Sequence, residues 1–191
     1  MVIIDIFFAG HLVEPMRLPA PPEALRVARA LTAFSQQEAA ELAGVTRRYI
    51  STAETSEAMF NLNLQLIDFY TARGIEFLGQ AAVGHEVLCA GARWRPPPTT
   101  TLLTSDYERY RTEDDGISFR GARALLNKTQ ADVAEEIGLS VATVKALERG
   151  GHWTDTSATM QLYFENQGVE FVGWGDASTR RYFGVGVRWK A

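Results

Sequence analysis

The sequence has little cysteine, no long apolar runs and no excess of positive charge. Its single cysteine, Cys89, excludes a disulfide within the chain and a cysteine-rich metal site, and it agrees with a reducing cytoplasm. No stretch approaches the roughly 20 consecutive apolar residues of a membrane span, so we expect no membrane partner. The apolar run 2–8 is short, contains Asp5 and lacks a basic start, which predicts a β-strand rather than a signal peptide.

Charge and chemistry narrow the functions further. The formal net charge of −4 argues against a general polyanion binder, but it leaves specific DNA binding through a local basic patch open. The histidines lie far apart with no cysteine or carboxylate at ligand spacing. No nucleophile motif, phosphate-binding loop or dinucleotide fingerprint occurs. The sequence therefore predicts a protein that is not an enzyme and that holds no metal and no cofactor.

What the sequence does contain is a repeat with a period of 94 residues. When Gly44 is set against Gly138, the register holds without an insertion over 26–79. Glutamines, alanines and glycines recur together in this alignment, and Glu54 falls on Glu148. Such a register implies two copies of one supersecondary unit.

Capping residues and hydrophobic spacing predict the same elements in each unit. Ser35 followed by Glu38 has the pattern of a capping box, and Thr129 followed by Asp132 repeats it with a weaker partner. Asn61 is expected to cap the fourth helix of the first unit. Helices are expected after the prolines at 19–22 and over 36–43, 47–55, 62–73, 117–126, 130–137, 141–149 and 156–167, and strands over 75–78, 83–94, 169–174 and 181–189.

These elements predict a mainly α fold with β-hairpins, arranged as two tandem units. The first unit and its N-terminal strand are expected at 1–94 with a core at 23–79, and the second unit at 116–191 with a core at 117–173. Residues 95–115 contain consecutive prolines and a run of threonines, and are expected to form an extended linker with solvated charges. The two hairpins are expected to share one sheet, which joins the units within one chain or joins two chains in a homodimer.

The middle of each unit has the spacing of a helix-turn-helix. Ala40 and Ala134 are small residues where the second helix would cross the first, and a glycine suited to a tight turn follows each of them. Ile50 and Val144 come after that glycine and would anchor the inner face of the second helix. Such a pair of helices projects the start of its second helix into a major groove.

These residues resemble the Cro/repressor-like (XRE) helix-turn-helix family, in two tandem copies. The second unit is the closer match, with Thr129 and Gln130 at its first helix and a Ser-to-Gly run over 140–150 at its second. The first unit departs at Thr55 and Ser56, where the second unit has arginine and glycine. The resemblance implies a bacterial or phage-type transcription regulator that binds double-stranded DNA, in the cytoplasm and at the nucleoid.

The resemblance also implies which residues contact DNA. Glutamines at the start of the first helices would hold backbone phosphates, and the exposed starts of the second helices would face the bases. The implied DNA-binding residues are Gln36, Gln37, Thr46, Arg47, Arg48, Tyr49 and Ser51 in the first unit and Gln130, Ser140, Val141, Ala142, Thr143 and Lys145 in the second. Either arginine can bind guanine O6 and N7, whereas Val141 and Ala142 can only touch a thymine methyl group, so we expect more discrimination from the first unit.

Two interpretations of function stay open on the sequence. One is a sequence-specific transcription regulator that reads the major groove with two non-identical helices. The other is a degenerate helix-turn-helix protein that acts on a protein partner, either as an anti-activator or on RNA polymerase or another regulator. The formal charge is zero over 24–74 and −1 over 118–168, so these modules gain little from counterion release.

Overall fold

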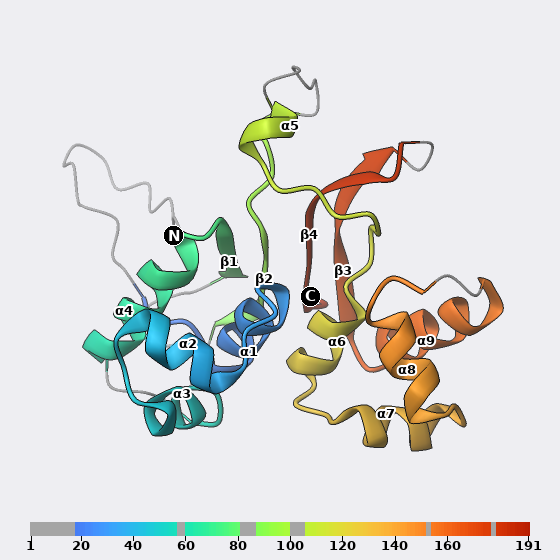
Figure 1. Cartoon of the computed structure of the whole chain (residues 1–191), viewed down its shortest axis with the longest axis horizontal. Coiled ribbons are helices and arrows are strands. Elements are labelled where there is room, and N and C mark those ends of the chain that lie inside the picture. Colours follow the sequence, from blue (N-terminus) through green and yellow to red (C-terminus); the bar gives the residue numbers. More distant parts are fainter. Residues whose placement is uncertain (1–17, 57–59, 81–86, 100–105, 152–153, 177–178) are drawn as a thin grey trace.

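The computed structural model describes residues 18–56, 60–80, 87–99, 106–151, 154–176 and 179–191, and Figure 1 shows two groups of helices beside a central set of strands. The first half contains α1 (Pro22–Leu31), α2 (Gln36–Ala43), α3 (Arg47–Ala53), α4 (Phe60–Thr71), β1 (Ile75–Gln80) and β2 (Leu88–Trp94). After α5 (Asp106–Arg109), the second half contains α6 (Phe119–Leu125), α7 (Gln130–Ile137), α8 (Val141–Leu147), α9 (Thr154–Asn166), β3 (Val169–Asp176) and β4 (Arg181–Trp189). The fold is thus a mixture of helices and antiparallel strands, in the same order in both halves. The expected strand at 2–8 lies outside the described residues.

Both predicted capping boxes are present in the structure. The Ser35 hydroxyl accepts a hydrogen bond from the backbone N–H of Glu38, whose carboxylate accepts one from the backbone N–H of Ser35. Thr129 and Asp132 make the same reciprocal pair at the start of α7. Each box satisfies backbone donors that the first turn of a helix leaves unpaired, which fixes where the helix begins. The structure therefore confirms the predicted helices 36–43 and 130–137.

The strands form one four-stranded antiparallel sheet with the order β1-β2-β4-β3. Each half contributes a hairpin, and the hairpins meet where β2 pairs with β4 in the register Ala92 to Val187. The shared sheet predicted from the sequence is thus confirmed, and it joins the two halves within a single chain. Figure 1 shows β2 and β4 running between the two helical groups.

Glycine is required where the two hairpins meet. Gly91 lies opposite Arg188 and Gly186 lies opposite Arg93, so the junction repeats itself about its centre. A Cβ atom on Gly91 would lie 2.1 Å from the carbonyl oxygen of Val187, and one on Gly186 would lie 2.3 Å from that of Ala92. Because backbone atoms of the partner strand fill this space, no larger residue fits at either position without moving a strand.

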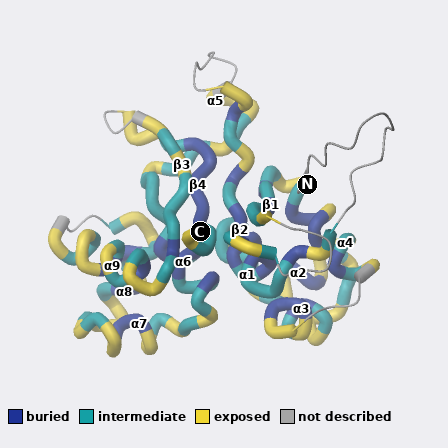
Figure 2. Tube along the Cα trace, turned by 180° about the vertical axis from the view of Figure 1, so that it is seen from behind, coloured by how far each residue is buried: buried dark blue, intermediate teal, exposed yellow. Residues whose placement is uncertain are grey.

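The core lies between the sheet and the helices that cover it. α1 and α6 pack against each other, α1 also packs on β2, and α6 also packs on β4. Buried Ile75 and Phe77 alternate along β1 with Glu76, which is ion-paired with Arg93. This alternation places one face of the sheet against the helices and leaves the ion pairs on the other face. In Figure 2 the central strands and α1 are mostly buried or intermediate, whereas α3 and α7 carry many exposed residues.

Several expectations need correction. Asn61 lies inside α4, which begins at Phe60, so the predicted cap at Asn61 is wrong. The segment that was expected to be a plain extended linker contains the short helix α5, and Glu113 pairs with Tyr182 in an isolated β-bridge. The guanidinium of Arg111 lies 4.4 Å from the centroid of the Trp94 ring. Tertiary contacts with β4 and β2 hold this segment, and local composition gives no sign of them.

The other element bounds differ by a few residues. α3 and α8 end at Ala53 and Leu147, and Glu54 and Glu148 occupy the C-cap positions that follow. The second strand begins at Leu88 as described, and the expected part of it over 83–86 lies outside the described residues. None of the described helices combines the length and the apolar character that a membrane crossing needs.

Candidate nucleic-acid interface

α2 and α3 form a tight helical pair in the first half. α2 ends at Gly44, whose φ of 68° is the left-handed conformation that glycine adopts at least cost. The Thr46 hydroxyl then accepts a hydrogen bond from the backbone N–H of Tyr49 and caps α3. Buried Ala40 and Ile50 form the contact between the helices. The inner face of α3 is thus anchored, and its first turn is left at the surface.

α7 and α8 repeat this arrangement in the second half. Gly138 ends α7 with the same φ of 68°, and Ser140 caps α8 by accepting from the backbone N–H of Thr143. Val133, Ala134 and Val144 are buried between the helices and the core. In both views of the chain, Figures 1 and 2, these four helices lie at the end of the molecule away from α5.

The start of α3 presents positive charge. Thr46, Arg47 and Arg48 are exposed, and neither arginine's guanidinium group has a hydrogen bond or an ion pair with any residue that the structure describes. Tyr49 and Ser51 are half-buried, and burial raises the pKa of the Tyr49 hydroxyl. That hydroxyl is buried and has no hydrogen-bond partner among the described residues. The two arginines are therefore the groups on α3 that are free to reach a ligand.

The start of α8 has a different chemistry. Val141 is 46% exposed, Ala142 is exposed as well, and both lack a polar side chain. The Thr143 hydroxyl lies 2.8 Å from the Ser140 hydroxyl, so the helix cap partly occupies it. Lys145 is exposed and makes no ion pair with the described part of the chain. The second helix thus offers apolar contacts and one cation where the first offers two guanidinium groups.

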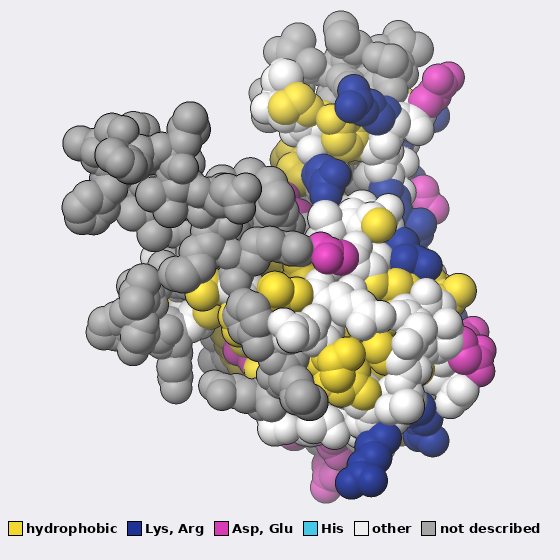
Figure 3. All heavy atoms as spheres, turned by 90° about the vertical axis from the view of Figure 1, so that its left-hand side faces the viewer, with side chains coloured by type: hydrophobic (Ala, Val, Ile, Leu, Met, Phe, Trp, Pro, Cys, Tyr) yellow, Lys and Arg dark blue, Asp and Glu magenta, His cyan; other side chains and the backbone are white. Residues whose placement is uncertain are grey.

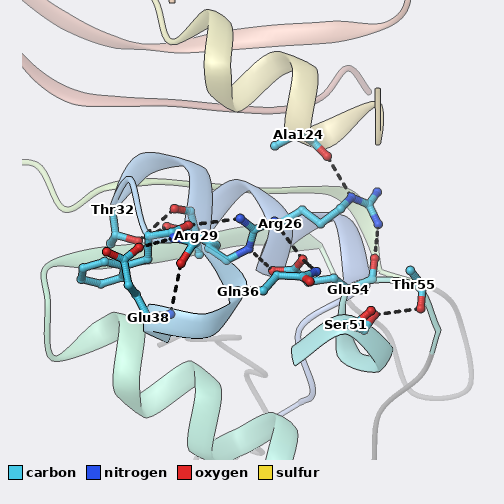
Figure 4. A network of polar contacts seen from close by, with 12 residues as sticks. Arg26, Arg29, Thr32, Gln36, Glu38, Ser51, Glu54, Thr55 and Ala124 are labelled. Carbon is cyan, nitrogen blue, oxygen red and sulfur yellow. Dashed lines mark hydrogen bonds and ion pairs between the residues drawn. The ribbon is translucent and has the colours of Figure 1, made fainter. Parts of the chain in front are cut away.

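Glu54 lies at the centre of a polar network behind α2 and α3, shown in Figure 4. Its carboxylate is ion-paired with Arg29 of α1 and accepts a hydrogen bond from Nε2 of Gln36 at 2.9 Å. Glu54 is only 3% exposed. Burial alone would lower the pKa of Arg29, but the hydrogen bond and the charge of Glu54 raise it above its ordinary value. The network ties the first residue of α2 to the end of α3.

The same network recurs in the second half. Arg123 is ion-paired with Glu148, and Nε2 of Gln130 donates to the Glu148 carboxylate at 2.7 Å. Sequence reasoning assigned no role to these arginines and glutamates, although all four recur at the 94-residue period. That recurrence of opposite charges was the available signal. The structural role of these recurring charges became clear only in the fold, where α1 and α6 pack near the helix pairs.

Gln36 and Gln130, two of the glutamines that the resemblance assigns to phosphate binding, are thus held in place by Glu54 and Glu148. An amide nitrogen carries two hydrogens, so Gln36 and Gln130 each keep one N–H for a ligand after the bond to the glutamate. Gln37 is exposed, and its Nε2 donates to Glu41 at 2.6 Å. Gln36 and Gln130 are also the first residues of α2 and α7. Unpaired backbone N–H groups at the start of a helix favour an anion such as a phosphate.

The surface around these helices carries charges of both signs. Figure 3, which shows the outer side of the first half, has basic and acidic side chains together at its lower end. Glu41, Glu135 and Glu136 are exposed on α2 and α7, the helices that begin with the glutamines. In the described part of the chain, no group of histidine, cysteine and carboxylate side chains is placed to hold a metal ion. The candidate interface therefore consists of two small basic and polar sites rather than a broad basic face.

A helix-turn-helix family model of the XRE type matches residues 119–157. The matched segment contains α6, α7 and α8 and extends into α9. The match indicates a DNA-binding regulator and supports DNA as the partner. It does not cover the first half of the chain. Comparisons with curated proteins and with solved structures gave no match.

Proposed function

We propose that the chain is a sequence-specific transcription regulator built from two tandem helix-turn-helix units, acting on double-stranded DNA in the cytoplasm. α3 and α8 are its two non-identical recognition helices. The observation that carries this proposal is the exposed, unpaired pair Arg47 and Arg48 at the start of α3. The helix that bears them has the same caps and the same Arg-Glu-Gln network as the helix pair within the matched segment.

The two helices read different bases in this proposal. An arginine of α3 makes a bidentate contact to guanine O6 and N7, a contact worth about 1–3 kcal/mol of discrimination. On α8, Val141 and Ala142 contact thymine methyl groups, and Lys145 contacts a phosphate. Gln36 and Gln130 hold one phosphate at each half-site and set the register of their helices.

The shared sheet gives the proposal its geometry. α3 and α8 belong to one polypeptide, and the pairing of β2 with β4 joins its two halves, so a single chain engages both half-sites. A helix-turn-helix dimer places its reading helices about 34 Å apart, one turn of DNA. We therefore expect a target with two dissimilar half-sites at about that spacing, and no need for a second chain.

Selection of bound duplexes from a random DNA pool tests this proposal. The unmodified chain is expected to enrich a motif with two dissimilar halves, one of which contains guanine. An Arg47→Ala/Arg48→Ala double variant is expected to lose the preference in that half and keep the other. Arg109→Ala is a control, because it removes an exposed cation from α5, at the opposite end of the molecule in Figure 1. Enrichment of a palindrome would overturn the single-chain arrangement.

One observation favours a second candidate, a protein-binding function for the second half. Val141, at the start of α8, is a large apolar side chain at the surface and is 46% exposed. An exposed apolar residue beside Ala142 suits a protein partner as well as a thymine methyl group. Salt titration separates the two functions, since each phosphate contact steepens the logarithmic salt dependence of DNA binding by about 0.9. No DNA enrichment at low salt would favour the protein partner.

A further inference from the structure

A pocket of about 430 Å³ lies between the two halves of the chain. The C-terminal end of α1, the N-terminal end of α6 and the turn after α8 line it. Leu31, Trp94, Ile117 and Val185 give it an apolar wall. This volume is within the range of small-molecule sites, which combine apolar walls with a few convergent polar groups.

The repeat-related position elsewhere in the molecule is filled by the side chain of Arg26. Arg26 of α1 reaches across to α6, where its Nε donates to the carbonyl oxygen of Ala124 at 2.8 Å. Its other nitrogens donate to the carbonyl oxygens of Leu125, at 3.1 Å, and of Glu54. Figure 4 shows this guanidinium between Ala124 and the end of α3. Burial lowers the pKa of Arg26, and three carbonyl acceptors surround its charge.

The repeat predicts that Arg120 makes the same contact as Arg26, but this contact is absent among the described residues. Arg120 stands 94 positions after Arg26, and the carbonyl groups at Ala30, Leu31 and Glu148 correspond to the acceptors of Arg26. All four of these residues line the pocket. Arg120 is half-buried, and its guanidinium group has no hydrogen bond or ion pair with any described residue. The pocket is therefore the open version of the Arg26 junction, with an unused guanidinium in its wall.

We propose that this pocket binds a small organic monocarboxylate with an apolar body, and that Arg120 binds the carboxylate. A planar guanidinium matches a carboxylate through two parallel hydrogen bonds. The apolar body lies against Ile117 and Leu31. The pocket favours one negative charge over two, because the carboxylate of Asp114 lies in the same lining and repels a second carboxylate.

Other charges in the lining fit this ligand. Arg149 in the turn after α8 is exposed and is unpaired among the described residues, so it adds to the positive potential. The Glu113 carboxylate is ion-paired with Arg111 at 2.8 Å, and the Glu148 carboxylate is ion-paired with Arg123. These two carboxylates are therefore neutralised by arginines of the protein, so they repel a bound anion only weakly.

Occupancy of the pocket would link the two halves. A ligand there contacts Leu31 at the end of α1 and the turn that follows α8, as Arg26 links α1 to α6 on the other side. The binding step stands independently of DNA. The further step, that occupancy changes the spacing of α3 and α8 and hence the affinity for DNA, rests on the proposed function.

Calorimetry on the full chain without DNA tests the binding step. The probes are benzoate, phenylacetate, indole-3-acetate and hexanoate, with the neutral amide of each as its control. We expect saturable binding of at least one acid at one site per chain, with the amide at least about tenfold weaker. The indole N–H resonance of Trp94, assigned with a Trp94→Phe variant, is expected to shift during the titration.

Substitutions then locate the site. Arg120→Gln is expected to weaken the acid at least about tenfold, since it removes a charge-assisted pair, and Arg120→Lys is expected to weaken it less. Arg95→Gln makes the same change of charge at an exposed residue outside the pocket lining, and is expected to bind normally. Unfolding midpoints check that each variant is folded. No binding of any acid, equal affinity for acid and amide, or unchanged affinity in Arg120→Gln would overturn the proposal.

Coupling to DNA is measured separately, on the duplex enriched by selection. A change in DNA affinity at a saturating concentration of the acid, absent in Arg120→Gln, would support control of DNA binding by the pocket. Unchanged DNA affinity with the acid bound would overturn that control and leave the binding site established. Failure of the chain to bind any DNA would overturn the proposed function alone, because the calorimetric result does not depend on it.

Discussion

Arg26 on α1 donates a hydrogen bond from Nε to the carbonyl oxygen of Ala124 on α6, 2.8 Å away, although the two residues are 98 positions apart. The bond lies at the C-terminal end of α6, where the Ala124 carbonyl oxygen also accepts from the backbone N–H of Asn127, just past the helix. A cation there also interacts favourably with the helix dipole. The contact joins the two halves at their helices, as β2 and β4 join them at the sheet.

Replacement of Arg26 is expected to destabilise the chain more than replacement of its repeat partner. Arg26→Met removes hydrogen bonds from a charged group to three carbonyl oxygens, and should lower the free energy of unfolding by about 2–3 kcal/mol. Arg120→Met should change it by less than about 0.5 kcal/mol, since Arg120 makes no such bond in the described part of the chain. Urea unfolding followed by circular dichroism measures both. Equal effects would show that the two arginines are equivalent in solution.

The buried ion pair behind α2 and α3 should be costly to break from one side. Glu54→Gln leaves Arg29 without its counter-charge and is expected to cost about 3–5 kcal/mol. The double variant Arg29→Met/Glu54→Met should cost much less than the sum of the two single changes, because no unpaired charge then stays buried. A double-mutant cycle in urea measures the coupling. Additive costs would contradict a direct interaction between these side chains.

A side chain at the strand junction should disrupt the link between the halves. In Gly186→Val the new Cβ would meet the Ala92 carbonyl oxygen at 2.3 Å, so β2 and β4 must separate. We expect a loss of more than about 3 kcal/mol or a failure to fold. Gly138→Ala is the matched control, since its Cβ meets nothing within 4 Å and only the positive φ of 68° opposes it. That control should cost about 1–2 kcal/mol. A milder effect of Gly186→Val than of the control would contradict the observed register.

Acid should weaken the fold through its ion-paired carboxylates. The hydrogen bond from Lys128 lowers the pKa of Glu136, and the hydrogen bond from Arg188 lowers the pKa of Glu170. A carboxylate with a lowered pKa in the folded state stabilises the fold above its unfolded pKa of about 4.3, and this stabilisation is lost as the pH falls through the folded pKa. Urea midpoints should therefore be level near neutral pH and fall below about pH 4. A Glu136→Gln/Glu170→Gln double variant should show a shallower fall, and an equally steep one would assign the acid sensitivity to other groups.

At alkaline pH, we expect the fold to lose stability as the pH rises. The hydrogen bond from Lys128 to Glu136 raises the pKa of Lys128. A lysine with a raised pKa stabilises the fold below its unfolded pKa of about 10.4, and this stabilisation is lost as the pH rises through the folded pKa. Lys128→Met should therefore reduce the loss of stability above about pH 10.

The amino-acid sequence by itself determined the local elements of this protein. Ser35 with Glu38 and Thr129 with Asp132 fixed the starts of α2 and α7, and Gly44 and Gly138 fixed their ends. Capping acts through hydrogen bonds between residues only a few positions apart, so it can be predicted without the fold. The one predicted cap that was wrong, Asn61, lies in a helix that begins one residue earlier.

Only the tertiary structure decided how the two halves meet. The sequence left open whether the hairpins pair within one chain, and the pairing of β2 with β4 answers that question through hydrogen bonds between distant strands. The repeat gives Arg26 and Arg120 the same local sequence position, yet one is used and the other lines a pocket. Contacts across the junction depend on where the opposite half lies, and no pattern within either unit contains that information. The candidate DNA-binding residues stay a prediction that the resemblance implies, whereas the network that holds Gln36 and Gln130 could be recognised only once α1 and α6 were in place.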